Sequence, residues 1–260
     1  MNRAAFGVDI GGSGIKGAPV DLETGQLTAD RFRIETPQPA TPSAIGNTVA
    51  KVLHHFAIAP GTAVGVTFPG VVQQGIVRTA ANLDPSLIGV NLRGKIRTRA
   101  RRDVRVMNDA DAAGFAEYKY GAAEGKDGVV LMVTLGTGIG TALIADGRLV
   151  PNTELGHLIV DGKDAEEYAA ESARERHNLD WAQWAAYVNR YLQEMERLLW
   201  PDLIIIGGGV SKEYEEFLPL LSLRAPVVPA ALRNEAGIVG AAAQAAEVAR
   251  IAEQHAARKN

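Results

Sequence analysis

Short runs in which apolar and polar residues alternate open the chain, and this pattern predicts β-strands. Residues 5–10, 15–20 and roughly 27–35 are typical of three consecutive antiparallel strands. Further strands are predicted where short apolar runs end at turn residues: 63–66, 104–107, 129–135, 142–145, 148–150 and 203–206. The last of these is apolar throughout, as expected of a strand covered on both faces.

Segments with helical spacing of apolar residues separate these strands. The predicted helices are 43–56, 93–100, 111–118, 164–175, about 181–199 and 236–256. Asp180 with Gln183 three residues later predicts a capped start for the fifth helix, and Pro201 prevents it from continuing. We expect the last helix, capped by Asn234 and rich in alanine, to pack closely and to return to the first lobe. The alternation of strands and helices indicates an α/β protein.

A glycine-rich turn joins the first two predicted strands. Glycine tolerates positive φ and lets bare backbone N–H groups approach an anion, and a lysine adds positive charge. A carboxylate at the end of the strand can hold Mg²⁺ through its waters. The same residues also suit an ordinary hairpin. These residues are Asp9, Gly11, Gly12, Ser13, Gly14 and Lys16.

The pattern occurs a second time, and the repeat favours phosphate binding over a simple hairpin. A shift of 125 positions superposes Val8 on Val133 and Gly11 on Gly136. A duplicated structural hairpin is the alternative. We interpret the repeat as two similar lobes that face one polyanionic ligand. The second turn supplies Thr134, Gly136, Thr137 and Gly138.

Composition and charge narrow the class of protein. The 260 residues are 47% hydrophobic and include no cysteine, which excludes disulfides and thiolate metal sites. The five histidines lack ligand spacing, so no bound zinc is expected. No run is long enough to span a membrane, and the first strand begins too early for a signal peptide. We expect a cytoplasmic protein without a membrane partner.

A net charge of −3 argues against binding of nucleic acid by bulk electrostatics. Basic residues nevertheless gather between positions 93 and 105, where Arg93 to Arg105 include seven arginines and lysines. This segment is either the solvated face of a helix or a track for a long polyanion.

Polar residues after three strands are candidates for chemistry. Asp109, with Asn108 before it, ends a strand and could accept a proton from a hydroxyl that attacks phosphorus. Asp109 or Asp111 could instead cap the next helix. Glu154 and His157 can bond sugar hydroxyls, although a lone histidine is often structural. Gly207, Gly208 and Gly209 could bring a nucleoside close to the backbone or form a plain strand-to-helix turn.

Five motifs occur in the order found in the ROK family of sugar kinases, which the chain resembles from residue 5 to about residue 248. The motifs are Asp9–Lys16, Asn108–Ala113, Leu135–Gly140, Glu154–His157 and Ile206–Val210. The resemblance implies a two-lobed, actin-like (ribonuclease H-like) ATPase fold. The expected lobes are 1–108, joined by the C-terminal helix of about 245–260, and 109–244. Homodimers are usual in this family.

The resemblance also implies a role for each matched residue. Asp109 would be the general base for the sugar 6-hydroxyl, and Asn82, Asn108, Glu154 and His157 would hold the sugar. Asp9 and both glycine turns would handle Mg²⁺ and phosphates, with the three consecutive glycines near a nucleoside.

Two departures from the family pattern matter. The cysteine-rich zinc motif that usually follows the histidine is absent, so His157 is left to the sugar and the helix at 164–175 is expected to brace it. The helix-turn-helix of the family's repressors is absent as well. With Leu232–Gly237, the chain looks like zinc-free members that phosphorylate glucose from inorganic polyphosphate, often also from ATP. The alternatives are an ATP-only hexokinase and, less favoured, a sugar-binding repressor or an actin-like assembly protein.

Overall fold

The computed structural model describes residues 4–80 and 83–257 and divides into two units. Unit 1 comprises Met1–Ala116 and Glu235–Asn260, and unit 2 comprises Glu117–Asn234. The boundaries thus fall at 116/117 and 234/235 rather than at the expected 108/109 and 244/245. The reason is that the first part of helix α3 (Asp109–Tyr120) and the whole of helix α8 (Ala236–Ala257) belong with the sheet of unit 1.

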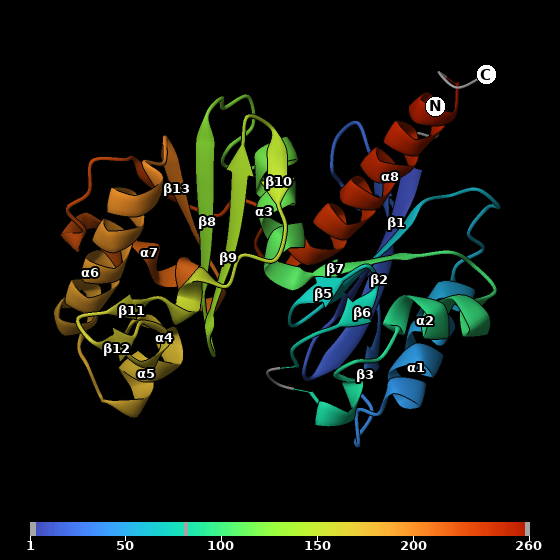
Figure 1. The fold of residues 1–260 in the computed structure, drawn as a ribbon, viewed down its shortest axis with the longest axis horizontal. Helices are drawn as coiled ribbons and strands as arrows, with labels where there is room; N and C mark the ends of the chain where they lie inside the picture. The colour runs from blue at the N-terminus through green and yellow to red at the C-terminus, as the bar shows by residue number, and fades with distance from the viewer. Residues whose placement is uncertain (1–3, 81–82, 258–260) are drawn as a thin grey trace. The chain divides into compact units, whose positions relative to one another are not determined.

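Unit 1 contains a five-stranded sheet with the order β3-β2-β1-β4-β7 (Figure 1). Strands β1, β2 and β3 are antiparallel neighbours, whereas β4 and β7 run parallel to β1. Of the strand predicted at 27–35, only β3 (Phe32–Glu35) forms a strand, and Leu27 makes a single β-bridge with Val20. The elements are β1 (Ala4–Ile10), β2 (Gly14–Asp21), β3 (Phe32–Glu35), α1 (Pro42–His55), β4 (Val64–Phe68), β5 (Val72–Gln73), β6 (Ile76–Val77), η1 (Pro85–Leu87), α2 (Leu92–Ala100) and β7 (Arg105–Asn108).

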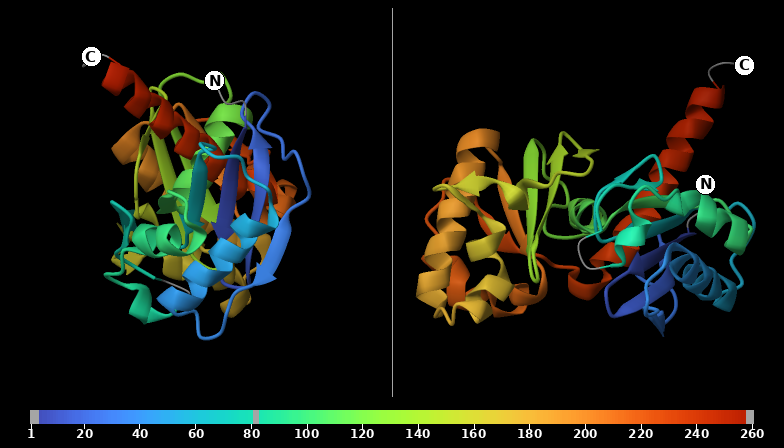
Figure 2. Two further views of the ribbon diagram at one scale, coloured as in Figure 1. Left: turned by 90° about the vertical axis from the view of Figure 1, so that its right-hand side faces the viewer. Right: turned by 60° about the horizontal axis from the view of Figure 1, so that its bottom comes forward.

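Helix α8 packs on the sheet of unit 1 at backbone distance, beside β1 (Figures 1 and 2). A Cβ atom at Gly7 would lie 1.9 Å from the carbonyl oxygen of Ile238, and one at Gly65 would lie 1.9 Å from that of Ala241. A Cβ atom at Gly240 would similarly lie 1.7 Å from the carbonyl oxygen of Ala112. Only glycine fits at these crossings. The prediction that the alanine-rich helix packs closely against the first lobe is confirmed.

Unit 2 contains a second five-stranded sheet with the order β10-β9-β8-β13-β14 (Figure 1). Its elements are β8 (Val129–Leu135), β9 (Ile139–Ala145), β10 (Arg148–Val150), η2 (Leu155–His157), β11 (Ile159–Val160), β12 (Lys163–Asp164), α4 (Glu166–Ala169), α5 (Glu171–Arg176), α6 (Trp181–Leu199), β13 (Leu203–Gly207), η3 (Gly209–Glu213), α7 (Tyr214–Phe217), η4 (Leu218–Leu220) and β14 (Val227–Pro229). A short helical turn, η5 (Arg233–Glu235), crosses into unit 1.

The two sheets repeat one plan. In each, a hairpin and a third antiparallel strand are followed by two parallel strands, and β8 matches β1 under the predicted shift of 125 positions. The turn of the second hairpin is one residue shorter than the turn of the first. Ile10 pairs with Ile15, whereas Leu135 pairs with Ile139. We call residues 11–14 the first tip and residues 136–138 the second tip.

Helix α6 supplies much of the core of unit 2 through the buried side chains of Trp184 and Tyr191. It starts with the predicted capping box of Asp180 and Gln183. The predicted helix at 164–175 is instead two short helices, because Ala170 has an extended backbone with ψ of 151°. Within the described residues, no helix is both long and apolar enough to cross a membrane.

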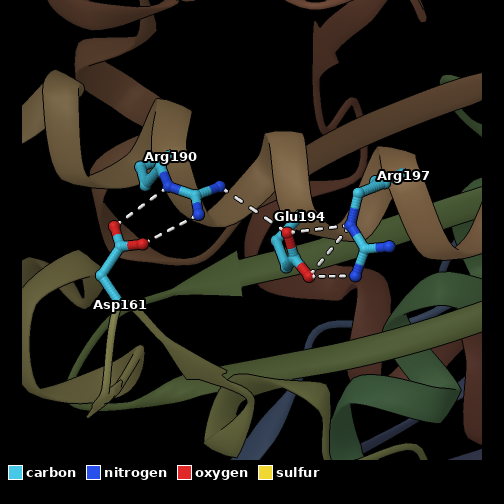
Figure 3. A network of polar contacts seen from close by, with 4 residues as sticks. All are labelled: Asp161, Arg190, Glu194 and Arg197. Atoms are coloured by element: carbon cyan, nitrogen blue, oxygen red, sulfur yellow. Dashed lines mark hydrogen bonds and ion pairs between the residues drawn. The ribbon is translucent and has the colours of Figure 1, made fainter.

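A chain of charged side chains ties α6 to the turn after β11 (Figure 3). Arg190 donates two hydrogen bonds to Asp161, at 3.0 and 2.8 Å. Glu194 lies between Arg190 and Arg197 on the outer face of the helix, 3.6 and 2.6 Å from their guanidinium nitrogens. Exposed pairs of this kind contribute little to stability. The Arg190–Asp161 pair joins the surface of α6 to the segment that follows Glu154–His157.

Candidate functional site

The carboxyl ends of three neighbouring strands form one edge of the unit 1 sheet. Asp9 on β1 is in register with Thr67 on β4, and Phe68 of β4 is in register with Asn108 on β7. Because β1, β4 and β7 are parallel, the first tip and the start of α3 emerge at the same edge. The structure therefore brings Asp9, the first tip, Asn108 and Asp109 together within unit 1.

Asp9 is held by contacts to both of its carboxylate oxygens. Oδ1 accepts a hydrogen bond of 2.6 Å from the Thr67 hydroxyl, and Oδ2 lies 3.2 Å from Lys16 Nζ. Gly237, in the first turn of α8, leaves room for the carboxylate, since a Cβ there would lie 3.1 Å from Oδ1. Mg²⁺ commonly uses one or two carboxylates, several waters and the phosphates of a substrate. A single partly exposed carboxylate beside a glycine-rich turn fits that coordination.

The first tip is closed by backbone and side-chain hydrogen bonds. The N–H of Gly11 donates to the Gly14 carbonyl at 3.0 Å, and the Thr36 hydroxyl donates to the Gly11 carbonyl at 2.5 Å. None of the three glycines of this turn has a positive φ, so their tolerance of that conformation is not used here. Gly12 instead has no heavy atom near its Cβ position, so the backbone there is open to a ligand.

Arg33 on β3 was not predicted as a site residue, yet it lies directly over the first tip. Its guanidinium donates a 2.7 Å hydrogen bond to the Ser13 carbonyl, and a Cβ at Gly14 would lie 2.4 Å from its Nε. In the β2–β3 register it stands opposite Lys16. The signal in the sequence was a basic residue on the neighbouring strand, but only the register places it at the tip.

Asn108, rather than Asp109 or Asp111, caps helix α3. Its buried side chain accepts the Asp111 N–H at 2.9 Å and donates to the Gly70 carbonyl at 3.2 Å. The amide nitrogen has a second hydrogen that a sugar hydroxyl could accept. Asp109 is the first residue of α3 and is half-buried, and its Oδ1 accepts the Ala110 N–H at 2.9 Å. Asn82 lies outside the described residues.

The basic segment at 93–105 is largely used for structure. Four of its seven basic residues donate hydrogen bonds to other residues of the same chain. Arg93 donates to Asp103, Arg99 to Asn47, Arg102 to the Ile58 carbonyl and Arg105 to Gln244. Lys95, Arg97 and Arg101 remain as candidates for contact with a polyanion.

The second tip, in unit 2, has the same closure as the first. The Gly136 N–H donates to the Gly138 carbonyl at 3.0 Å, and the Gly136 backbone is open. Thr134 stands where the first copy has Asp9 and donates to the Gly140 carbonyl at 3.3 Å. The second copy therefore offers backbone amides and a hydroxyl but no carboxylate at the strand end.

Two residues of the segment after β12 form hydrogen bonds with the second tip and with Ile139, which follows it. Glu166 accepts the Ile139 N–H at 2.7 Å and lies flat against Gly138, where a Cβ would meet its carboxylate at 2.5 Å. The Ser172 hydroxyl donates to the Thr137 carbonyl at 2.7 Å, and its N–H donates to the Gly136 carbonyl at 3.1 Å. Sequence reasoning missed both residues because nothing local to them indicates contact with a distant turn.

The turn at Glu154–His157 is seated on β9. Gly156 allows it, since a Cβ there would lie 2.3 Å from the Ile139 carbonyl oxygen. The Leu155 N–H donates to the Thr141 hydroxyl at 3.2 Å, which fixes the same turn from the other side. The spacing Glu-Leu-Gly-His thus places the two polar side chains at the ends of a short, close-packed helical turn.

The charges around this turn set its acid–base behaviour. His157 Nδ1 lies 3.0 Å from Asp164 Oδ2, and this hydrogen bond is the main reason that the pKa of His157 is raised. Burial raises the pKa of the Glu154 carboxyl, with Glu166 adding to the rise and His157 opposing it. Asp164 also accepts the Glu166 N–H at 3.0 Å. The segment at 164–175 therefore contacts His157 through Asp164, at its first residue.

The three consecutive glycines after β13 have different environments. A Cβ at Gly207 would lie 2.6 Å from Met132 Cε, and Gly208 has a φ of 87° and packs on the Leu135 carbonyl. These two serve the strand-to-helix turn. At Gly209 a Cβ would lie 3.1 Å from the Glu171 carboxylate, so this glycine faces a charged group.

Unit 2 therefore gathers the second tip, Glu154, His157 and the three glycines. Within the part of the chain that the structure describes, no three histidine, aspartate or glutamate side chains are grouped to hold a metal ion.

A family model, a curated relative and solved structures all relate this chain to the same group of proteins. Residues 5–175 match the model of the ROK family. A polyphosphate glucokinase of Mycobacterium tuberculosis H37Rv is 54% identical, over 92% of this chain and 90% of that protein. The crystal structure of an inorganic polyphosphate/ATP-glucomannokinase from Arthrobacter sp. strain KM is similar, with a TM-score of 0.87, 52% identity and coverage of 94% of this chain and 99% of that chain. A ROK family glucokinase from Streptomyces griseus, solved with glucose and AMPPNP, has a TM-score of 0.78 at 27% identity, over 94% and 99% of the two chains.

Proposed function

The chain belongs to the ROK family and has its actin-like α/β fold, and on this basis we propose that it is a glucokinase that uses inorganic polyphosphate. It would transfer the terminal phosphoryl group of polyphosphate, and also of ATP, to the 6-hydroxyl of glucose in the cytoplasm. The observation that supports this most is identity above half with a polyphosphate glucokinase over nearly the whole chain. The arrangement in unit 1 adds a carboxylate at the same sheet edge as a phosphate turn.

Asp109 acts as the general base in this proposal. Its carboxylate takes the proton of the 6-hydroxyl as the sugar oxygen forms a bond to the terminal phosphorus and the bridging P–O bond breaks. The electron pair of that bond leaves with the shortened polyphosphate, or with ADP when ATP is the donor. The position of Asp109 at the start of α3, set by the Asn108 cap, fixes the carboxylate relative to the first tip.

Charge on the transferred group is balanced by Lys16, by backbone N–H groups of both tips and by Mg²⁺. Asp9 would hold Mg²⁺ through water, and the ion would supply positive charge to the phosphates of the donor. Arg33 adds a second cation next to Lys16 at the first tip.

The sugar is held by hydrogen bonds from Asn82, Asn108, Glu154 and His157 in this proposal. Asp164 fixes the His157 ring through Nδ1, which leaves Nε2 to meet a sugar hydroxyl. The glucomannokinase among the similar structures makes mannose a second acceptor to test.

We also propose a homodimer, supported by the exposed apolar side chains of Ile159 and Tyr187 in unit 2. A monomeric mass by light scattering would contradict it.

The experiment that tests the function is a donor exchange. The purified protein is given glucose and Mg²⁺ with either nucleotide-free polyphosphate or ATP, and glucose 6-phosphate is measured. We expect product from both donors, and donor consumption that depends on the sugar. Product from ATP alone would indicate an ATP-only hexokinase, and no sugar-dependent transfer from either donor would indicate a binding protein.

A further inference from the structure

The second tip and the three glycines after β13 lie next to each other within unit 2, because β13 pairs with β8 up to Gly207 and Thr134. Gly208 packs against the Leu135 carbonyl, immediately before the tip, at a distance where a Cβ would lie 2.1 Å from that oxygen. Ser172, at the start of α5, holds the Thr137 and Gly136 carbonyls. A donor bound at the second tip that extends toward the glycines therefore meets the first turn of α5.

Glu171 is the residue at that meeting point. It precedes Ser172, and its Oε2 lies 3.1 Å from the Cβ position of Gly209. Burial raises the pKa of this carboxyl, and the neighbours Glu175 and Glu213 add to the rise while Arg174 and Lys212 oppose it. The carboxylate has no catalytic task in the reaction described above, and it places negative charge beside two elements assigned to an anionic donor.

The chemical difference between the two donors begins just beyond the third phosphate. ATP continues there with an uncharged ribose, whose hydroxyls donate hydrogen bonds that a carboxylate accepts. Polyphosphate continues with further negatively charged units, which a carboxylate repels. A single carboxylate at this point therefore disfavours long polyphosphate relative to ATP.

We propose that Glu171 is a specificity-determining residue that disfavours long polyphosphate relative to ATP at the surface formed by the second tip and Gly209. This rests on the proposed function, because it assumes that the donor binds along that surface. The Glu171 carboxylate would act on the part of the donor beyond the third phosphate and not on the phosphate that reacts. Tripolyphosphate, which ends where the ribose of ATP would begin, should be insensitive to the residue.

The test compares wild type with Glu171→Gln, which keeps the size and a hydrogen-bond acceptor but removes the charge. The matched control is Glu175→Gln, four residues later on the same helix. For each protein, kcat/KM is measured at saturating glucose with long polyphosphate, tripolyphosphate and ATP. Circular dichroism and the thermal midpoint confirm that each variant is folded.

We expect Glu171→Gln to raise kcat/KM for long polyphosphate about fivefold while tripolyphosphate and ATP change less than about twofold, as expected for removal of one partly screened charge. Glu175→Gln should change the ratio of the donors much less. Equal changes for all three donors, or no change for long polyphosphate, would overturn the role of Glu171. Failure of the wild type to phosphorylate glucose from any donor would overturn the proposed function instead.

Discussion

The glycines of the two turn tips provide room for neighbouring side chains. Gly14 lies under the guanidinium of Arg33, and Gly138 lies under the carboxylate of Glu166. Neither has a positive φ, so their value at these positions is the missing Cβ and not a special backbone conformation. Larger residues would displace the charged group that each tip carries.

The pairing of His157 with Asp164 gives a pH dependence that can be measured directly. Asp164→Asn removes the partner that chiefly raises the pKa of His157, so this pKa should fall toward the ordinary value of about 6.5. The stabilisation from the pair is present below the ordinary pKa and is lost as pH rises through the raised pKa. Because the His157 side chain is 57% exposed, the contribution to stability is below about 1 kcal/mol.

The measurement is an NMR titration of the histidine ring protons in wild type and variant. Only the curve of His157 should move to lower pH, and the curves of the other histidines should superimpose. A His157 curve that is unchanged in Asp164→Asn would show that another group sets its pKa.

At the scale of single residues, the strand pattern predicted where several polar side chains lie but not which residues they contact. Asp9, Lys16, Asn108 and Asp109 gather at one sheet edge, as the strand pattern indicated. The contacts of Arg33 and of Thr67 could not be predicted, because they depend on register between strands that are far apart in the chain.

Among the elements, helix α3 is anchored in unit 2 by one buried carboxylate. Glu117 accepts backbone N–H groups from Ala122, Ala231 and Leu232, at 2.8, 3.0 and 2.7 Å. Its side chain is fully buried. The segment at 231–232 therefore depends on a side chain of a helix that lies more than a hundred positions earlier in the chain.

Glu117→Ala should lower the free energy of unfolding by about 3 kcal/mol, since three backbone N–H groups lose the fully buried carboxylate that accepts from them. Urea unfolding at neutral pH measures the change. Asp161→Asn is the control, because it breaks the exposed pair with Arg190 (Figure 3) and should leave the unfolding midpoint nearly unchanged. Equal losses in the two variants would contradict this role of Glu117.

Element by element, the sequence predicted the repeated hairpins, the capping box of α6 and the close packing of α8, because each rests on a local pattern. The break at Ala170 was not predictable. The alanine-rich stretch has good helix propensity throughout, and the extended residue there is set by contacts of the neighbouring helices with the second tip.

For the whole molecule, the repeated sheet and the ROK family follow from motif order, and the comparisons confirm the family. The unit boundaries differ from those expected because α8 packs on unit 1 from its first residues. The basic segment at 93–105 shows that a count of basic residues does not predict how many are available to bind a polyanion. Arginine donates to carbonyls and carboxylates of its own chain as readily as to a ligand, and four of the seven residues do so.

The central claim is that Asp109 deprotonates a sugar hydroxyl during phosphoryl transfer, and Asp109→Asn tests it most directly. The amide keeps the size of the side chain and an acceptor for the Ala110 N–H but cannot take the proton. Glucose binding by calorimetry and kcat with polyphosphate and ATP are measured beside Asp127→Asn, an exposed control. We expect kcat of Asp109→Asn to fall about 10²- to 10⁴-fold with both donors while glucose affinity stays within about threefold. A kcat within about twofold of wild type would contradict the account.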